Sequence, residues 1–471
     1  MTVSASRNPD LTGGPAASRS IPDTVAHLRA TFRSGRTRPI EWRLAQLEAV
    51  ERMLAEREQD FADALAEDLG RPAVEAWLAD LAPVTNESAH ARKRLRSWMR
   101  PTRVPVPLSL MPGKAWYQYE PLGVALVIGP WNYPVHLVLA PLVAALAAGN
   151  CAVLKPSEHT PTVSATLRRI VPEYLDRDAV VVVEGDAATT QALLDQGFDH
   201  CFFTGGPEIG KAVMAGAAKH LTPVTLELGG KSPVIVADDA RVKVAARRIA
   251  WAKLLNSGQT CVAPDYVLVD RKVRDLFVDE LTKAITTFGA KHDVMLPLVN
   301  ARHAARIASL VDSAGGTTVH GGASDPTGKR AELTVIVDPD PDSALMREEI
   351  FGPVLPLVTI DSMDDAIAHV LQGPKPLSVY LFTEDRANEN RVVAEISNGG
   401  TVINHLMYHL LVNELPFGGV GNSGMGAYHG KWGFETFSHR KSVVRKPTRP
   451  DPSLAYPPYT KLKQKIMRKV F

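Results

Sequence analysis

A cysteine in a turn of small polar residues is the feature of this sequence that most clearly suggests chemistry. Cys261 lies in the run Asn256-Ser-Gly-Gln-Thr-Cys-Val-Ala-Pro-Asp-Tyr266, and Glu227 lies upstream in Leu226-Glu-Leu-Gly-Gly-Lys-Ser-Pro233. A thiolate nucleophile needs a polar and reachable place, which such a turn provides, whereas the other two cysteines lie in apolar runs. The pattern predicts a thiol nucleophile with a separate carboxyl group that acts as acid or base.

The two segments together resemble the nucleophile and general-base segments of aldehyde dehydrogenases. Val-Ala-Pro-Asp-Tyr after the cysteine is most similar to the class 3 branch, which includes the fatty, aromatic and coniferyl aldehyde enzymes, and the resemblance extends over roughly residues 25–460. It implies that Cys261 attacks the aldehyde, that hydride passes to a nicotinamide, and that Glu227 activates water to hydrolyse the resulting thioester. The implied product is a carboxylic acid, because branches that transfer the acyl group to coenzyme A generally lack this base.

A third catalytic residue comes from the segment Pro130-Trp-Asn-Tyr-Pro134. By composition alone, Asn132 between two prolines is typical of a turn. The segment resembles the one that supplies an oxyanion donor in the family, so the resemblance assigns the side-chain amide of Asn132 to that role, together with the backbone N–H of Cys261. Glu227 also has an alternative interpretation, because a glutamate at the end of an apolar strand commonly pairs with a cation and Lys231 is close in sequence.

Further segments resemble the cofactor-binding segments of the family and imply NAD or NADP. Gly205-Gly-Pro-Glu-Ile-Gly210 opens an expected helix whose N-terminal amides could face a pyrophosphate, although such glycines alone fit a structural turn equally well. Gly206 stands where the family has serine, so a hydroxyl contact is lost. In Lys155-Pro-Ser-Glu158, the carboxylate favours the 2'-OH of NAD and the lysine favours the 2'-phosphate of NADP. The cofactor residues implied by the resemblance are Trp131, Lys155, Ser157, Glu158, Gly205, Gly206, Gly210, Glu349 and Phe351.

The resemblance also implies a pocket for a small-molecule aldehyde, to which Tyr133, His405 and Phe417 would contribute. Phe417 lies in a glycine-rich loop that lacks the Lys and Ser/Thr ending of a phosphate-binding P-loop. His405 and His409 have a spacing that could bind a metal on a helix, but no glutamate follows the first histidine and no third ligand is evident. We therefore expect no metal site.

The composition is that of a soluble globular protein. The chain has 471 residues, of which 45% are apolar and 22% charged, with a formal net charge of +2. This balance argues against a nucleic-acid partner. Three cysteines cannot form a disulfide framework, and a free thiol suits the reducing cytoplasm. Residues 1–20 lack the apolar core of a signal peptide, and we expect them to be a disordered tail.

Apolar strands that alternate with helices predict an α/β fold with parallel sheets, and helical periodicity precedes them. The resemblance implies an aldehyde dehydrogenase-like fold, with two Rossmann-like parallel α/β domains and a small β oligomerisation element. The expected boundaries are 21–102 and 121–229 for the cofactor-binding domain, 230–422 for the catalytic domain, 103–120 and 423–450 for the oligomerisation and bridging elements, and 451–471 for a basic C-terminal tail.

The expected hairpin at 103–120 and the C-terminal region bear on assembly. Val443-Val-Arg-Lys446 could be an edge strand, and unpaired edges are commonly covered, so we expect a homodimer to which this strand and the hairpin contribute. Residues 461–471 mix five cations with apolar residues. A tail that is solvated or packed on a subunit is the favoured interpretation, and contact with a membrane surface is the less favoured one.

Two other classes of function compete with the dehydrogenase. A cofactor-free thiol esterase or hydrolase would use the cysteine and the glutamate but not Asn132, Glu349 and Phe351. A non-catalytic scaffold of the same fold would tolerate changes at the three catalytic positions, all of which are intact. The sequence therefore favours an NAD(P)-dependent aldehyde dehydrogenase, without deciding among aliphatic, long-chain and aromatic aldehydes.

Overall fold

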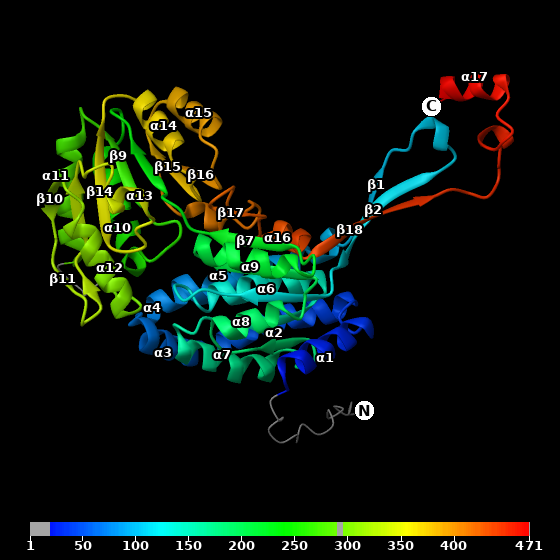
Figure 1. Ribbon diagram of the computed structural model, residues 1–471, viewed down its shortest axis with the longest axis horizontal. Helices are drawn as coiled ribbons and strands as arrows, with labels where there is room; N and C mark the ends of the chain where they lie inside the picture. Colours follow the sequence, from blue (N-terminus) through cyan, green and yellow to red (C-terminus); the bar gives the residue numbers. More distant parts are fainter. Residues whose placement is uncertain (1–18, 290–294, 471) are drawn as a thin grey trace, which may run out of the picture.

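The computed structural model describes residues 19–289 and 295–470, which form two largely parallel sheets and a projecting antiparallel arm (Figure 1). Most of the tail expected at 1–20 lies outside the described residues. In Figure 1 the arm extends from the body of the molecule and carries the C-terminal helix at its far end. The α/β fold predicted from the sequence is confirmed, whereas the domain boundaries stay predictions.

The first sheet has the described strand order β17-β7-β6-β3-β4-β5, and β17 is antiparallel to its neighbour. Its strands are β3 (Val124–Ile128), β4 (Cys151–Lys155), β5 (Val180–Val182), β6 (His200–Gly205), β7 (Val224–Leu228) and β17 (Gly424–Met425). The connecting helices are α6 (His136–Ala148), α7 (Pro161–Tyr174), α8 (Ala187–Leu194) and α9 (Pro207–Ala218). Leu126 and Val127 belong to different core clusters, because successive strand residues point to opposite faces and both faces are covered.

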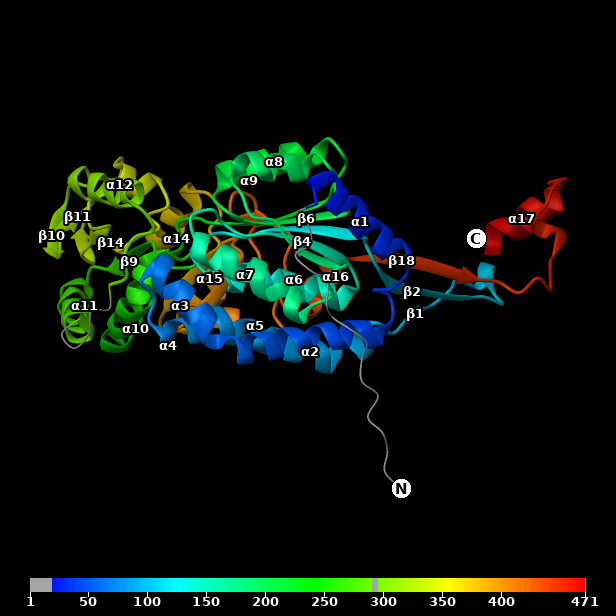
Figure 2. The ribbon, with the colours of Figure 1, turned by 90° about the horizontal axis from the view of Figure 1, so that it is seen from below.

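The N-terminal helices cover this sheet. They are α1 (Ile21–Arg33), α2 (Ile40–Glu56), α3 (Glu58–Leu69), α4 (Ala73–Ala76), a π-helical turn η1 (Trp77–Leu81) and α5 (Ala82–Trp98). Figure 2 shows α2, α3 and α5 as an outer layer beneath α6 and α7, with α8 and α9 on the opposite face of the sheet. α6 is apolar on all sides because it is enclosed between the sheet and the outer helices.

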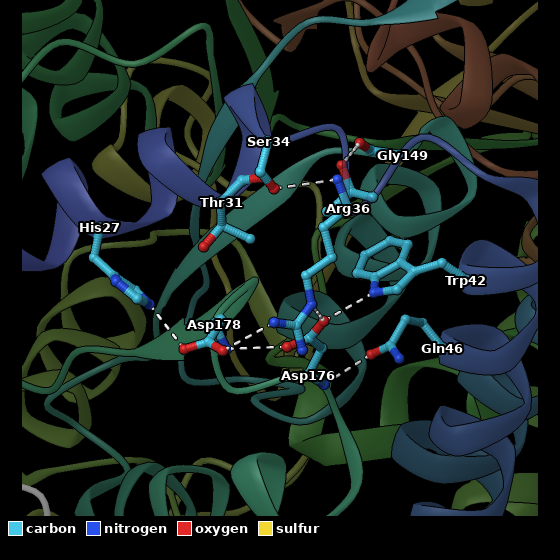
Figure 3. A network of polar contacts seen from close by, with 10 residues as sticks. His27, Thr31, Ser34, Arg36, Trp42, Gln46, Gly149, Asp176 and Asp178 are labelled. Carbon is cyan, nitrogen blue, oxygen red and sulfur yellow. Dashed lines mark hydrogen bonds and ion pairs between the residues drawn. The ribbon is translucent and has the colours of Figure 1, made fainter.

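A polar network fastens α1 and α2 to the loop that follows α7 (Figure 3). The guanidinium of Arg36 pairs with Asp176 at 2.8 Å, and the indole N–H of Trp42 donates to the same carboxylate at 2.9 Å. His27 lies 2.9 Å from Asp178. These contacts join segments that are far apart in sequence, and they lie away from the cavity described below.

The second sheet has the described order β10-β13-β14-β9-β8-β15-β16, in which β10 is antiparallel. Its strands are β8 (Pro233–Val236), β9 (Tyr266–Asp270), β10 (Thr317–His320), β13 (Thr334–Val337), β14 (Val354–Ile360), β15 (Ser378–Phe382) and β16 (Gly400–Ile403). Its other elements are the helices α10 (Val242–Leu254), α11 (Arg274–Gly289), α12 (Ala301–Asp312), α13 (Ala344–Arg347), α14 (Met363–Gln372) and α15 (Arg386–Glu395), the turns η3 (Leu255–Gly258) and η4 (Tyr408–Leu411), and the small pair β11 (Ser324–Asp325) and β12 (Arg330–Ala331).

The arm has the order β1-β2-β18. The expected hairpin is β1 (Thr102–Val104) and β2 (Lys114–Pro121), joined through η2 (Leu108–Leu110). The expected edge strand belongs to β18 (Ser438–Arg445), which follows α16 (Gly430–Thr436) and begins earlier than the sequence indicated. The chain then passes η5 (Ser453–Ala455) and ends in α17 (Lys461–Val470). Within the described ranges, no helix combines the length and the apolarity needed to cross a membrane.

Candidate active site

A cavity of about 530 Å³ lies where β3, β4, β6 and β7 end, and loops of the second sheet close it. Ligand sites of parallel sheets form at the carboxyl ends of the strands, so this position is the expected one. The cavity brings together most of the residues predicted from the sequence, namely Trp131, Asn132, Lys155, Ser157, Glu158, Gly205, Gly206, Glu227, Cys261, Glu349 and Phe351. Its lining does not include Gly210, Tyr133, His405 or Phe417.

Cys261 is half-buried in the loop that follows α10. Asn256 and Ser257 open this loop with φ values of 51° and 52°, a left-handed conformation that non-glycine residues adopt at a cost and mostly at functional sites. Gly258 has a φ of +71°, and a Cβ there would lie 2.3 Å from the carbonyl oxygen of Gly352. The loop therefore packs directly against the backbone beside Phe351, which requires glycine at this position.

Burial raises the pKa of the Cys261 thiol to about 12, and the carboxyl groups of Glu349 and Glu227 add to the effect. Both effects disfavour the thiolate. Burial removes its solvation, and a nearby carboxylate repels its negative charge. The raised pKa favours the neutral thiol, so a base or a positive charge in the cavity would be needed to stabilise the thiolate.

Asn132 reaches the same loop from the turn after β3. Its side-chain amide donates to the carbonyl oxygen of Gln259 at 3.1 Å, and its own carbonyl accepts from Asn256 Nδ2 at 3.1 Å. Tyr133 joins the contact through a 2.7 Å hydrogen bond between its hydroxyl and Thr260 Oγ1. The predicted oxyanion donor therefore contacts the loop that carries Cys261, the predicted nucleophile, and Tyr133 lies beside that loop.

Glu227 is the penultimate residue of β7. It is buried, and neither carboxylate oxygen is hydrogen-bonded to any described residue. Burial raises its pKa well above the ordinary value. The alternative partner, Lys231, instead pairs with Asp265 and donates to the carbonyl oxygens of Leu345 and Glu348, both at 2.9 Å. Buried carboxyl groups that serve structure are nearly always hydrogen-bonded, so an unpartnered one facing a cavity indicates a functional role.

A second part of the cavity wall carries Glu349 and Phe351. Glu349 is buried, and burial followed by the charge of Asp265 raises its pKa to about 8. A Cβ on Gly229 would lie 2.0 Å from the Glu349 carboxylate, so glycine is required for this close approach. Phe351 meets Trp131 edge to face, with ring centroids 5.3 Å apart.

Arg306 is a residue of this wall that sequence reasoning missed. Its guanidinium donates to the carbonyl oxygens of Glu349 at 2.6 Å and Ile350 at 2.8 Å, and thus holds the backbone of the segment that carries Glu349 and Phe351. Arg302 and His303 line the cavity next to it. They open α12 outside every recognisable motif, so no local signal in the sequence distinguishes them from surface residues.

The turn at the start of α9 faces the cavity. Gly205 and Gly206 line it, and a Cβ on Gly206 would meet no atom within 4 Å, so there is open space beside this helix N-terminus, a place that favours anions. Gly210 instead packs under Leu228, where a Cβ would lie 2.7 Å from a side-chain carbon. Its glycine therefore serves helix–strand packing, and the structure does not bring it to the cavity.

Lys155 and Glu158, which the sequence predicts to hold the adenosine ribose, form an ion pair at 3.0 Å in the lining of the cavity. A carboxylate suits a ribose hydroxyl, whereas an ammonium group suits a 2'-phosphate. The site therefore holds groups that suit each form of the cofactor.

His405 lies in a separate hollow of about 310 Å³ with Arg247, Arg248, Trp251, Phe288 and Tyr408. Its ring stacks on Tyr408 with centroids 3.5 Å apart. The structure therefore does not bring His405 to the cavity that holds Cys261. His409 lies elsewhere, against Phe417, whose buried ring also contacts Tyr428. Within the described ranges, no group of three or more His, Cys, Asp or Glu residues has an arrangement that could hold a metal ion.

Comparison with known proteins matches the aldehyde dehydrogenase family model to residues 14–443. The chain belongs to the aldehyde dehydrogenase family. It is 44% identical over 435 residues to 4,4'-diaponeurosporen-aldehyde dehydrogenase of Staphylococcus aureus, a match that covers 92% of this chain and 95% of the relative. It is also 44% identical over 431 residues to the dimeric NADP-preferring aldehyde dehydrogenase of Rattus norvegicus, covering 91% of this chain and 95% of the relative.

A solved structure of Staphylococcus aureus AldH in a substrate-bound state superimposes on this aldehyde dehydrogenase with a TM-score of 0.92 and 43% identity, over 96% of this chain and 99% of the other. Relatives named as family 3 aldehyde dehydrogenases match at similar identity, which confirms the branch predicted from the sequence. The aldehyde dehydrogenase described here therefore catalyses NAD(P)-dependent oxidation of an aldehyde.

Proposed function

We propose that this aldehyde dehydrogenase forms a carboxylic acid through a covalent adduct on Cys261. The observation that carries this proposal is a single cavity lined by a half-buried cysteine, by Asn132 and by a buried glutamate that has no hydrogen-bond partner among the described residues, and also by the glycine turn at the N-terminus of α9. A thiol hydrolase would need the first group of features and not the second.

In the proposed reaction, the Cys261 thiol loses its proton to water and Sγ attacks the carbonyl carbon as the thiolate. The new oxyanion accepts hydrogen bonds from the Asn132 amide and the Cys261 N–H. NAD or NADP held in the cavity would accept the hydride that leaves the adduct, and a thioester on Cys261 would remain. Glu227 then takes a proton from water, whose oxygen attacks the thioester and expels the thiolate. The raised pKa makes the Glu227 carboxylate a stronger base, while fewer molecules carry it ionised at neutral pH.

Trp131, Lys155, Ser157, Glu158, Gly205, Gly206, Glu349 and Phe351 would hold the cofactor, and all of them line the cavity. We assign the phosphates to the glycine turn and the adenosine ribose to the Lys155–Glu158 pair. Tyr133 and Phe417 are proposed to shape the aldehyde pocket, because Tyr133 contacts the nucleophile loop and the ring of Phe417 is buried against the aromatic ring of Tyr428.

The function is tested by the absorbance of reduced cofactor with NAD or NADP and a panel of aliphatic, long-chain and aromatic aldehydes. The panel includes 4,4'-diaponeurosporen-aldehyde, because the Staphylococcus aureus relative is named for it. We expect reduction with at least one pair, and chromatography should then identify the matching carboxylic acid. A folded protein that reduces neither cofactor with any aldehyde would contradict the proposal.

We also propose a homodimer that forms through the arm. β18 and the β1–β2 hairpin project from the body. The residues of β1 and most of those of β18 are exposed, those of β2 are mostly half-buried, and Leu108 and Val444 are exposed apolar residues of the arm. Three of the mammalian relatives are named dimeric. Light scattering at micromolar concentration should give about twice the chain mass of 51.1 kDa, and Val444→Asp should lower it. A monomeric mass for the wild type would contradict this prediction.

The remaining proposals concern location. Free cysteines, two of them buried and Cys261 half-buried, suit the cytoplasm. For α17, with Leu462 and Ile466 exposed among lysines, we favour a helix that is solvated or packed on a partner subunit over one bound to a membrane surface. Sedimentation with anionic vesicles at physiological salt should therefore leave the protein in the supernatant.

A further inference from the structure

Arg71 occupies a position between the two segments that carry the proposed catalytic groups. It is 1% exposed, and one guanidinium nitrogen donates to the carbonyl oxygen of Asn132 at 2.6 Å and to Asn256 Oδ1 at 2.8 Å. The guanidinium carbon lies 4.8 Å from the centroid of the Tyr133 ring. One buried cation thus contacts the turn after β3 and the start of the nucleophile loop.

Asp80 neutralises Arg71 and anchors it to α6. The two side chains form a fully buried ion pair, and Asp80 Oδ1 also accepts from the backbone N–H groups of Val135 and His136, each at 3.1 Å. Asp80 belongs to the π-helical turn η1, a rare conformation that occurs frequently at functional sites. A buried ion pair is weak evidence for a gain in stability, because the free-energy cost of desolvating the two charges often exceeds their attraction. A role other than stability therefore explains this pair better.

The hydrogen bonds around Arg71 continue to the backbone just before Cys261, at the carbonyl oxygen of Gln259. Asn256 Nδ2 donates to the carbonyl oxygens of Asn132 at 3.1 Å and Gln259 at 3.0 Å. The Asn132 amide donates to that same Gln259 oxygen at 3.1 Å. The guanidinium therefore fixes Asn132 from its backbone side, while the amide of the same residue is directed at the nucleophile loop.

We propose that Arg71, held by Asp80, is a positioning residue that sets the Asn132 amide and the Cys261 loop at the separation needed to stabilise the adduct. It acts through Asn132 and Asn256. Arginine is required because its planar fork serves the carboxylate and both acceptors at once, whereas lysine is a point charge. The inference rests on the proposed roles of Asn132 and Cys261.

Arg71→Lys tests the inference, with Arg43→Lys as a matched control. Arg43, a residue of α2, is also buried, and its guanidinium donates to the backbone carbonyl oxygens of Arg38 and Ala147. Ala147 lies at the C-terminal end of α6, whereas Arg71 and Asp80 lie at its N-terminal end. We expect Arg71→Lys to lower kcat about tenfold to 100-fold, because small misplacements of a catalytic group have effects of this size. The KM for cofactor and the rate of Cys261 alkylation by iodoacetamide should stay within about twofold of wild type. Arg43→Lys should keep kcat within about twofold.

A double-variant cycle separates positioning from general stability. In an Asn132→Ala background, Arg71→Lys should lower kcat by less than about threefold more, because the group that it positions is already absent. A fully additive loss, an unchanged kcat in Arg71→Lys, or an equal loss in Arg43→Lys would overturn the inference. If Asn132→Ala itself keeps full kcat, the proposed role of Asn132 fails and the inference fails with it. If Asn132→Ala loses kcat and Arg71→Lys does not, the inference about Arg71 fails while the proposed role of Asn132 stands.

If Arg71→Lys does not fold, Asn256→Ala provides a second test, because it leaves the buried ion pair in place and removes one bridge between Arg71 and the nucleophile loop. We expect a loss of kcat of about tenfold with cofactor KM retained. Unchanged turnover by soluble Asn256→Ala would count against the inference.

Discussion

Replacing Cys261 with alanine is expected to abolish aldehyde oxidation, with a loss in kcat of at least about 10⁴-fold, because no other group can form the thioester. Cys151 and Cys201 are fully buried in strands, and burial raises the pKa of each thiol to about 12. Neither reaches the cavity, so neither can replace the nucleophile. Steady-state formation of reduced cofactor measures the loss, and binding of the cofactor to Cys261→Ala, followed by fluorescence, should persist.

Cys201→Ala is the matched control for this variant, because it removes a buried thiol from β6 without touching the cavity lining. It should keep kcat within a few-fold. Turnover by Cys261→Ala above about 1% of wild type would show that another group carries the reaction.

The ionisation of the Cys261 thiol should make its rate of alkylation depend on pH. The pKa of Cys261 is raised to about 12 in the free protein, so the thiolate fraction should grow with pH throughout the range in which the protein is handled. The alkylation rate of the free enzyme by iodoacetamide should accordingly rise from pH 7 to about pH 10 without a plateau. A plateau near pH 7 would mean that the cavity stabilises the thiolate in the absence of cofactor.

Replacing Glu227 with glutamine is expected to stop the reaction after one hydride transfer per site, with the thioester still on Cys261. Glutamine has nearly the same shape but cannot accept a proton, so the adduct and the thioester should form while hydrolysis fails. Rapid mixing should show a burst of about one reduced cofactor per site, followed by turnover about 10²-fold to 10⁴-fold slower than wild type. Mass spectrometry of the quenched protein should find the acyl group on Cys261.

Glu87→Gln is the control, because Glu87 is also buried with a pKa raised by burial to about 7, but it accepts a hydrogen bond from the Gly430 N–H and lies outside the cavity lining. It should show steady turnover without a burst. If Glu227→Gln hydrolyses its thioester at the wild-type rate, water is activated by another group and the proposed role is wrong.

The hydrophobic pattern of this chain was sufficient to predict the α/β class and the hairpin of the arm, and the resemblance of its local motifs to a known family pointed to eleven of the residues that line the cavity. The run Val124–Ile128 is apolar at every position, so it requires cover on both faces, and it forms a strand between helix layers. Cys261, Glu227 and Asn132 each lie in a short segment whose composition marks a turn or a strand end. Such local features depend on neighbours in the chain, and the sequence therefore determines them directly.

Partner choice over long separations was decided by the tertiary structure. Arg71 meets Asn132 and Asn256 across 61 and 185 residues, and no periodicity or motif connects these positions. Lys231 is bound by Asp265, which leaves Glu227 unpartnered, and Gly210 packs beneath Leu228 instead of facing the cavity. His405 lies in another hollow because the turn after β16 faces α10. These outcomes depend on which strands become neighbours and where their ends meet, which is a property of the folded topology and not of any local stretch of sequence.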